Sequence, residues 1–253
     1  MDKVGNSINR RILQLALPAL GSLIAEPLLT MADSILIGHL GTFELAGLAI
    51  GSTVLNLIVG MSVFLAYTTT AVTGHAIGAG KSQEGLRKGI QGIWLGAALG
   101  TILALILIVF ASPIVSVFKG QEEVLGFART YLLVSAPGLV AMLSVLAANG
   151  VFRALLDTRT PLVVTTTGAL INVPISTILI FPCGLGIAGA GAGTAISQFI
   201  MTGWLGMVIV KKLHLEGVSA RPSFKLILHS GLHGMPLVFR SLFLQAAIVV
   251  TTW

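Results

Sequence analysis

The sequence predicts an all-α protein that crosses a lipid bilayer several times. Hydrophobic residues make up 55% of its 253 residues and charged residues only 9%, whereas a soluble domain carries about 25% charged residues. The apolar residues gather into about seven runs, each long enough to cross a hydrocarbon core of ~30 Å as a helix of ~20 residues. Too little polar surface remains for a water-soluble globule, so we predict a multi-pass helical bundle.

Charged and turn-forming segments separate the first four runs. The first span is expected at 12–37 and ends at GHLGTFE, and the second, at 46–73, ends before GAGKSQEGLRK. The third is expected at 90–111, before SPIVSVFKGQEE, and the fourth at 131–151, before RALLDTRTP. Because glycine, proline and clustered charges favour loops over helix interiors, each separating segment predicts a connection between two helices.

The last three runs follow the same logic. A fifth span at 162–181 and a sixth at 187–210 are separated by FPCGLG, and KKLHLEGVSARPSFK follows the sixth. The seventh run, at 235–253, resembles a restart of the first, because Pro236 in HGMPLVFRS aligns with Pro18 in LALPALGSL. Transporters are often built from such repeats, with the site at their interface.

The repeat sets the expected domain boundaries. Six complete spans fall within 1–210, a connecting segment occupies 211–228, and part of a seventh helix lies within 229–253. The chain stops where a second unit would have barely begun, so we expect a truncated or partial chain.

Lysine and arginine concentrate in alternate loops, which predicts the orientation in the membrane. Loops on the cytoplasmic side carry an excess of these residues. This rule places the N-terminus and 211–228 in the cytoplasm, in a multi-pass protein of the cell (inner) membrane. The residues expected on the cytoplasmic side are Lys3, Arg10, Arg11, Lys81, Arg87, Lys88, Arg153, Arg159, Lys211, Lys212, Arg221 and Lys225.

Two carboxylates in the first span are the leading site candidates. Asp33 lies seven residues after Glu26, a rotation of roughly 700° and a rise of about 10 Å, so both share one helix face. Ionisable groups at membrane depth are costly and mark functional sites. Such a face can hold a proton, a small cation or a cationic substrate. The alternatives are that Asp33 only caps the following loop and that Glu26 satisfies backbone groups beside Pro27.

Polar side chains inside other spans are expected to complete a pocket with Asp33. Asn172 and Ser176 are four residues apart and share a helix face, and Pro174 between them frees backbone carbonyls. Carboxylate, hydroxyls and carbonyls together suit a proton relay or a hard cation. The alternative is a role in joining helices, worth ~0.6 kcal/mol per hydrogen bond. Further candidates are Thr194 and Gln198 in the sixth span and Asn56 in the second.

The residue patterns exclude several function classes. A membrane enzyme needs a nucleophile beside a base, or a metal cluster; the sequence shows neither pattern, so we predict no enzyme, no metal site and no cofactor. Cys183 is the single cysteine, and the five histidines lack metal-ligand spacing. The net charge of +6 comes from basic residues scattered between apolar runs, so we predict no nucleic-acid partner.

Several motifs together resemble a known transporter family. LALPALGSLIAEPLLTMADSILIGHLG resembles the first helix of multidrug and toxic compound extrusion (MATE) transporters, particularly the DinF-like branch. TTTAVTGHAIGAGK is similar to the end of that family's second helix, GVFRALLDTRTP to the turn after its fourth, and PLVFRSLFLQ to the start of its seventh. The resemblance extends over residues 10–253. It implies a twelve-helix fold of two six-helix lobes, of which this chain holds the N-terminal lobe and the start of helix seven.

The resemblance also implies roles for particular residues. Pro18 matches the family's first-helix proline, which we assign to the substrate cavity or its gating, and Asp33 matches the coupling aspartate. Asn172 matches a fifth-helix asparagine and Thr194 a sixth-helix threonine. Ser176 stands where many members carry an aspartate, so one negative charge is missing. Proton coupling through Asp33, with Glu26 as a second site, is therefore favoured over sodium coupling.

The predicted function is a secondary active antiporter. It would export drugs or organic, often cationic, compounds in exchange for protons. Its expected partners are the lipid bilayer, the organic substrate, and a C-terminal lobe or a second copy of the chain. One alternative is a flippase for lipid-linked precursors, which would line its cavity with several basic residues, where the spans offer only Arg240. Another is a non-transporting membrane subunit.

Overall fold

The computed structural model describes residues 20, 24, 31–223 and 243. Within these residues every regular element is helical and no strand occurs, which confirms the all-α class. A helical segment at 31–38 precedes the first complete helix. The complete helices are α2 (Thr42–Met61), α3 (Phe64–Gly78), α4 (Ser82–Ser116), α5 (Glu122–Ser135), α6 (Gly138–Ala154), α7 (Arg159–Ile180) and α8 (Ile187–Leu215). The partial helix expected at 229–253 lies outside the described residues except for Phe243.

Four helical stretches in the described part of the chain are long and apolar enough to cross a membrane. They are Thr42–Gly78, which joins α2 and α3, together with α4, α7 and α8. The pair α5 and α6 provides a fifth if the two helices, bent by 58°, are counted as one span. These five stretches correspond in order to the second to sixth predicted spans. The first predicted span, 12–37, is described only in part.

Two predicted boundaries around the third and fourth spans are wrong. The segment SPIVSVFKGQEE was expected to be a loop, yet α4 continues through Pro113 to Ser116 and α5 begins at Glu122. The fourth span therefore starts well before residue 131. Its bend follows from Pro137, which has no N–H to bond to the preceding turn. Helix α4 continues past Pro113 with a local kink at Phe110, three residues before the proline.

The sixth span also extends further than expected. Helix α8 continues to Leu215, so residues 211–215 of the expected connecting segment are helical. Lysine and leucine are good helix formers, and cations are favourable in the last turn of a helix. Lys212 and His214 supply those cations.

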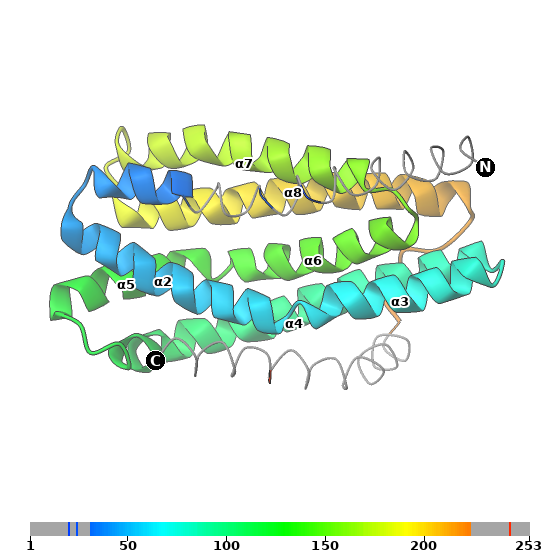
Figure 1. The fold of residues 1–253 in the computed structure, drawn as a ribbon, viewed down its shortest axis with the longest axis horizontal. Coiled ribbons are helices and arrows are strands. Elements are labelled where there is room, and N and C mark those ends of the chain that lie inside the picture. Colours follow the sequence, from blue (N-terminus) through cyan, green and yellow to red (C-terminus); the bar gives the residue numbers. More distant parts are fainter. Residues whose placement is uncertain (1–19, 21–23, 25–30, 224–242, 244–253) are drawn as a thin grey trace, which may run out of the picture.

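The connections between helices gather at two opposite ends of the bundle (Figure 1). The α3–α4 turn, the α6–α7 connection and the end of α8 lie together at one end, which we name the basic end. The segment 39–41, the loop before α5 and the α7–α8 connection lie at the other. The described lysines and arginines that these elements carry are Lys81, Arg87, Lys88, Arg153, Arg159, Lys211 and Lys212, and Arg221 follows in the segment after α8.

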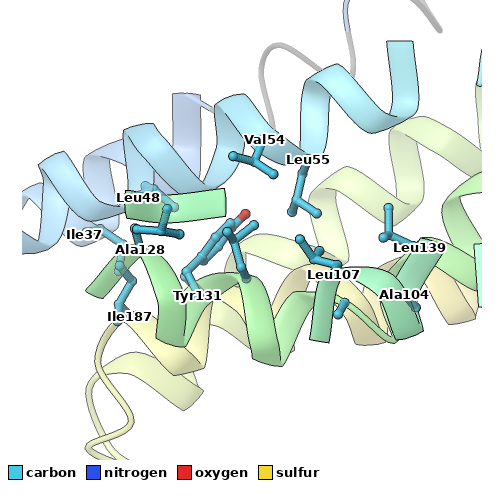
Figure 2. Packing of buried hydrophobic residues seen from close by; sticks show 14 of the residues in the cluster. Ile37, Leu48, Val54, Leu55, Ala104, Leu107, Ala128, Tyr131, Leu139 and Ile187 are labelled. Carbon is cyan, nitrogen blue, oxygen red and sulfur yellow. The ribbon is translucent and has the colours of Figure 1, made fainter. Parts of the chain in front are cut away.

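Two clusters of buried apolar side chains join the helices. One includes Leu86, Phe152 and Leu213 near the basic end. The other lies toward the opposite end, where Tyr131 of α5 packs beneath Leu48 and Leu55 of α2 (Figure 2). Lipid tails are as apolar as leucine, so these clusters stabilise the bundle through close van der Waals contact rather than through removal from water.

The gathering of lysine and arginine at one end leads to a labelling test of the predicted orientation. In a Cys183→Ser background, we expect His214→Cys at the end of α8 to react with a membrane-impermeant maleimide only after the cells are opened. Gln121→Cys, in the loop before α5 at the opposite end, should react in intact cells. Both positions are exposed. The reverse pattern would show that the basic end faces outward.

Candidate ion-coupling site

Asp33 is a buried carboxylate that contacts α8. Only 4% of its surface is exposed. Its Oδ2 accepts a hydrogen bond from Thr194 Oγ1 over 3.1 Å, between residues 161 positions apart in the sequence. Its Oδ1 has no hydrogen-bond partner among the described residues. A carboxylate with so little exposed surface needs a compensating proton or cation, because burying an isolated charge is costly.

Helix α8 reaches the site by packing very closely against α7. A Cβ placed on Gly189 would lie 2.7 Å from the backbone carbon of Leu179. A Cβ placed on Gly193 would overlap the Ser176 hydroxyl. The Gly-rich stretch IAGAGAGTA therefore serves close helix packing, and it brings Thr194 within reach of Asp33.

Asn172 and Ser176 lie on the buried face of α7, as their spacing predicted. Both side chains are fully buried. Ser176 lies beside the Asp33 carboxylate as well as against Gly193. The Asn172 amide and the Ser176 hydroxyl have no hydrogen-bond partners among the described residues. Buried polar groups are nearly always paired with a hydrogen-bond partner. A group of neighbouring buried polar atoms without partners is therefore where an exchangeable ion or proton is expected.

A small cavity opens onto Asp33 from the side of α2. Its volume is about 50 Å³, enough for a few water molecules at roughly 10–15 Å³ each and well below the ~300–1,000 Å³ typical of organic ligand sites. Three of the predicted residues, Asn56, Thr194 and Gln198, lie with Asp33 in its wall. The remaining lining residues are Leu48, Ser52, Leu55, Val59, Tyr131 and Met142.

Tyr131 is a site residue that the sequence reasoning missed. Its side chain is 4% exposed and lines the cavity beside Asp33. Gly51 of α2 makes room for the ring, since a Cβ there would lie 2.5 Å from the Tyr131 ring. A phenol inside an apolar span is itself a signal, because a buried hydroxyl needs a polar partner.

One sequence prediction about the site is wrong. Pro174 was expected to free a carbonyl near Asn172 and Ser176, but Pro174 is exposed. Leu170, whose carbonyl Pro174 leaves without its usual helical partner, is 69% exposed. The freed carbonyl therefore lies on the outer face of α7 and does not join the site. Glu26, Pro18 and Arg240 lie outside the described residues, so their roles stay predictions.

These features define a multi-pass membrane protein built as a helical bundle around a buried carboxylate. The chain belongs to the MatE family of transporters, whose family model matches residues 18–178. Among curated relatives, DNA damage-inducible protein F of Escherichia coli is 30% identical over 84% of this chain and 47% of its own length. A probable multidrug resistance protein NorM of Thermotoga maritima is 27% identical over 81% and 45%.

The fold of a solved transporter agrees with this assignment. The Vibrio cholerae MATE transporter VcmN, in its bent form, superposes with a TM-score of 0.84 at 24% identity, over 98% of this chain and 57% of that one. The chain thus spans about half the length of the relatives it matches. This extent agrees with the predicted correspondence to one lobe of a larger fold.

Proposed function

We propose that this chain forms the N-terminal half of an efflux antiporter that exports drugs or other organic cations in exchange for protons. The observation that supports this most directly is the buried Asp33, with one oxygen bonded to Thr194 and the other unpartnered among the described residues. A carboxylate at this depth holds either a proton or a positively charged ligand. Proton and cationic substrate then exclude each other at one group, which is the differential binding that exchange requires.

Protons are favoured over sodium as the coupling ion. Asp33 is the one carboxylate among the described residues that line the cavity, and Ser176 beside it is neutral. A hard cation is held by several oxygen ligands, preferably with more than one negative charge. A proton needs a single carboxylate oxygen. Glu26 is proposed as a second proton site or as a group that tunes Asp33.

The proposed exchange cycle depends on access to Asp33 from outside. With the basic end in the cytoplasm, the helical segment 31–38 lies in the opposite, outer half of the bundle (Figure 1). A proton from outside reaches Asp33 and displaces the bound cation. Pro18, Asn56 and Gln198 are proposed to form the substrate side of the cavity or its gate. A C-terminal lobe, or a second copy, would supply the facing wall and the rocking motion.

The coupling ion can be tested by separating the two gradients. We expect vesicles that hold this chain together with a C-terminal lobe to accumulate a fluorescent organic cation under an imposed pH gradient without sodium. An imposed sodium gradient at constant pH should drive no accumulation. Transport driven by sodium alone would contradict proton coupling, and vesicles with this chain alone should show neither response.

The same assay with Ser176 variants tests whether the missing negative charge at this position accounts for the expected lack of a sodium response. Ser176→Asp should introduce a sodium response, because it adds a second carboxylate beside Asp33. Ser176→Asn is the matched control, since it has the same size without the charge. A sodium response in both variants would assign the effect to the crowding of Ser176 against Gly193 rather than to charge.

A further inference from the structure

Residues 216–223, which follow α8, are attached to the bundle. Gly217 adopts a positive φ of 67°, and its N–H bonds to the His214 carbonyl while the Val218 N–H bonds to the Leu213 carbonyl. This pattern is a Schellman cap, which reverses the chain at a helix end and favours glycine at that position. It turns residues 216–223 back toward α4.

Three side chains of α4 hold these residues through their main chain. Gln83 Nε2 donates to the Glu216 carbonyl over 3.0 Å, and Trp94 Nε1 donates to the Ala220 carbonyl over 3.0 Å. Positions 83, 91 and 94 fall within about 80° of one another on a helix, so these side chains form one stripe. Because these bonds go to backbone groups, they depend on the backbone conformation of residues 216–223 and not on their side chains.

Gln91 is the central contact of this stripe. Its Nε2 donates to the Arg221 carbonyl over 3.0 Å, and its Oε1 accepts from the Ser223 N–H over 2.7 Å. The side chain is 1% exposed. A buried amide in a membrane helix is costly unless both of its ends are paired. Residues 216–223 thus satisfy a polar group that would otherwise be left inside the bundle.

Apolar contacts support the same attachment. Val218 and Ala220 pack against the buried cluster near the basic end, to which α4 contributes Leu86 and Ile90 and α8 contributes Leu213. The segment therefore joins the end of one helix to the side of another. Among the described residues, neither its polar nor its apolar contacts involve the site around Asp33.

We propose that residues 216–223 form a strap that belongs to this bundle, latched to α4 by Gln91. Any tether to a following part of the chain would then start from Ser223 instead of from the end of α8. Release of the strap would lengthen that tether by up to roughly 26–29 Å, the reach of eight extended residues. The strap itself is independent of the proposed transport function. The strap would also limit how far a second lobe moves at the basic end, and this consequence rests on the proposed transport function.

Hydrogen exchange measured by mass spectrometry on the purified chain tests the latch. The Ser223 amide should be protected in the wild type, and Gln91→Leu should raise its exchange roughly tenfold, as expected for the loss of one net hydrogen bond. Gln121→Leu, in the loop before α5, is the matched control and should change nothing in 216–223. Trp94→Phe, which removes only the bond to Ala220, should give a smaller increase.

A distance measurement separates loosening of the strap from loss of the fold. Nitroxides at Arg87→Cys in α4 and Ser219→Cys in the strap, in a Cys183→Ser background, should give one narrow distance distribution. Gln91→Leu should broaden it, while exchange within α6 and α7 stays unchanged. Unprotected exchange of Ser223 in the wild type would overturn the strap. So would unchanged exchange in both Gln91→Leu and Trp94→Phe. Since no step uses transport, these outcomes do not depend on the coupling mechanism.

Discussion

Replacing Asp33 with asparagine is expected to reduce proton-driven efflux to the level of vesicles without the protein. Asparagine keeps the size of the side chain and an oxygen that accepts from Thr194 Oγ1, but it cannot bind and release a proton. The competition between proton and cationic substrate is therefore lost. The measurement is efflux of a fluorescent cation under a pH gradient, with this chain and a C-terminal lobe in the same vesicles.

The folded bundle itself should tolerate this change. An uncompensated carboxylate buried at 4% exposure is costly, so Asp33→Asn should insert normally and unfold no more easily than the wild type. Glu122→Gln, in the exposed first turn of α5, is the matched control and should retain full efflux. Undiminished proton-driven efflux by Asp33→Asn would show that the coupling site lies elsewhere.

Gly189→Ala is expected to destabilise the bundle by about 1–3 kcal/mol, the range for an overpacked interior. The added methyl would lie 2.7–2.9 Å from the backbone of Leu179 and Ile180. Backbone atoms cannot rotate out of the way as a flexible side chain does, so α7 and α8 must move apart. The measurement is the unfolding free energy in detergent micelles, followed by the loss of helical circular dichroism.

The same helix offers the control for this prediction. Among the described residues, no heavy atom lies within 4 Å of a Cβ added at Gly203. Gly203→Ala should therefore be neutral or stabilising by up to about 1 kcal/mol, because alanine favours the helix over glycine. If both variants were equally stable, the close α7–α8 approach would not govern stability. A loss of Thr194 contact with Asp33 should accompany the destabilisation in Gly189→Ala.

Hydropathy predicted the spans well because the lipid core imposes one requirement on every helix that crosses it. It did not predict where helices end. SPIVSVF is apolar enough to continue α4, and the lysines after residue 210 continue α8, since neither stretch has to lie within the hydrocarbon core. The bend between α5 and α6 could have been located, because Pro137 lies inside that stretch.

At the candidate site, the sequence predicted the spacing of residues within one helix but not the contacts between helices. Helical spacing within one segment correctly paired Asn172 with Ser176, but two residues rotate by ~200°, which already places Pro174 on the other side of α7. The meeting of Asp33 with Thr194 spans 161 positions and depends on glycines that let α8 approach α7, which periodicity does not encode. Tyr131 was missed for the same reason, because the cavity that it lines is built mostly from residues of other helices.

The small size of the cavity beside Asp33 bears on two parts of the proposed function, the binding of the coupling ion and the recognition of the exported compound. About 50 Å³ accommodates a proton and its hydrating water, but it has no room for a compound of drug size. In the proposed cycle, a cation of that size therefore reaches Asp33 only in a conformation in which this cavity is wider. The proposal then assigns the recognition of the bulk of an exported compound to the surface that this chain would share with a second lobe. Selectivity and energy coupling would then be free to evolve separately.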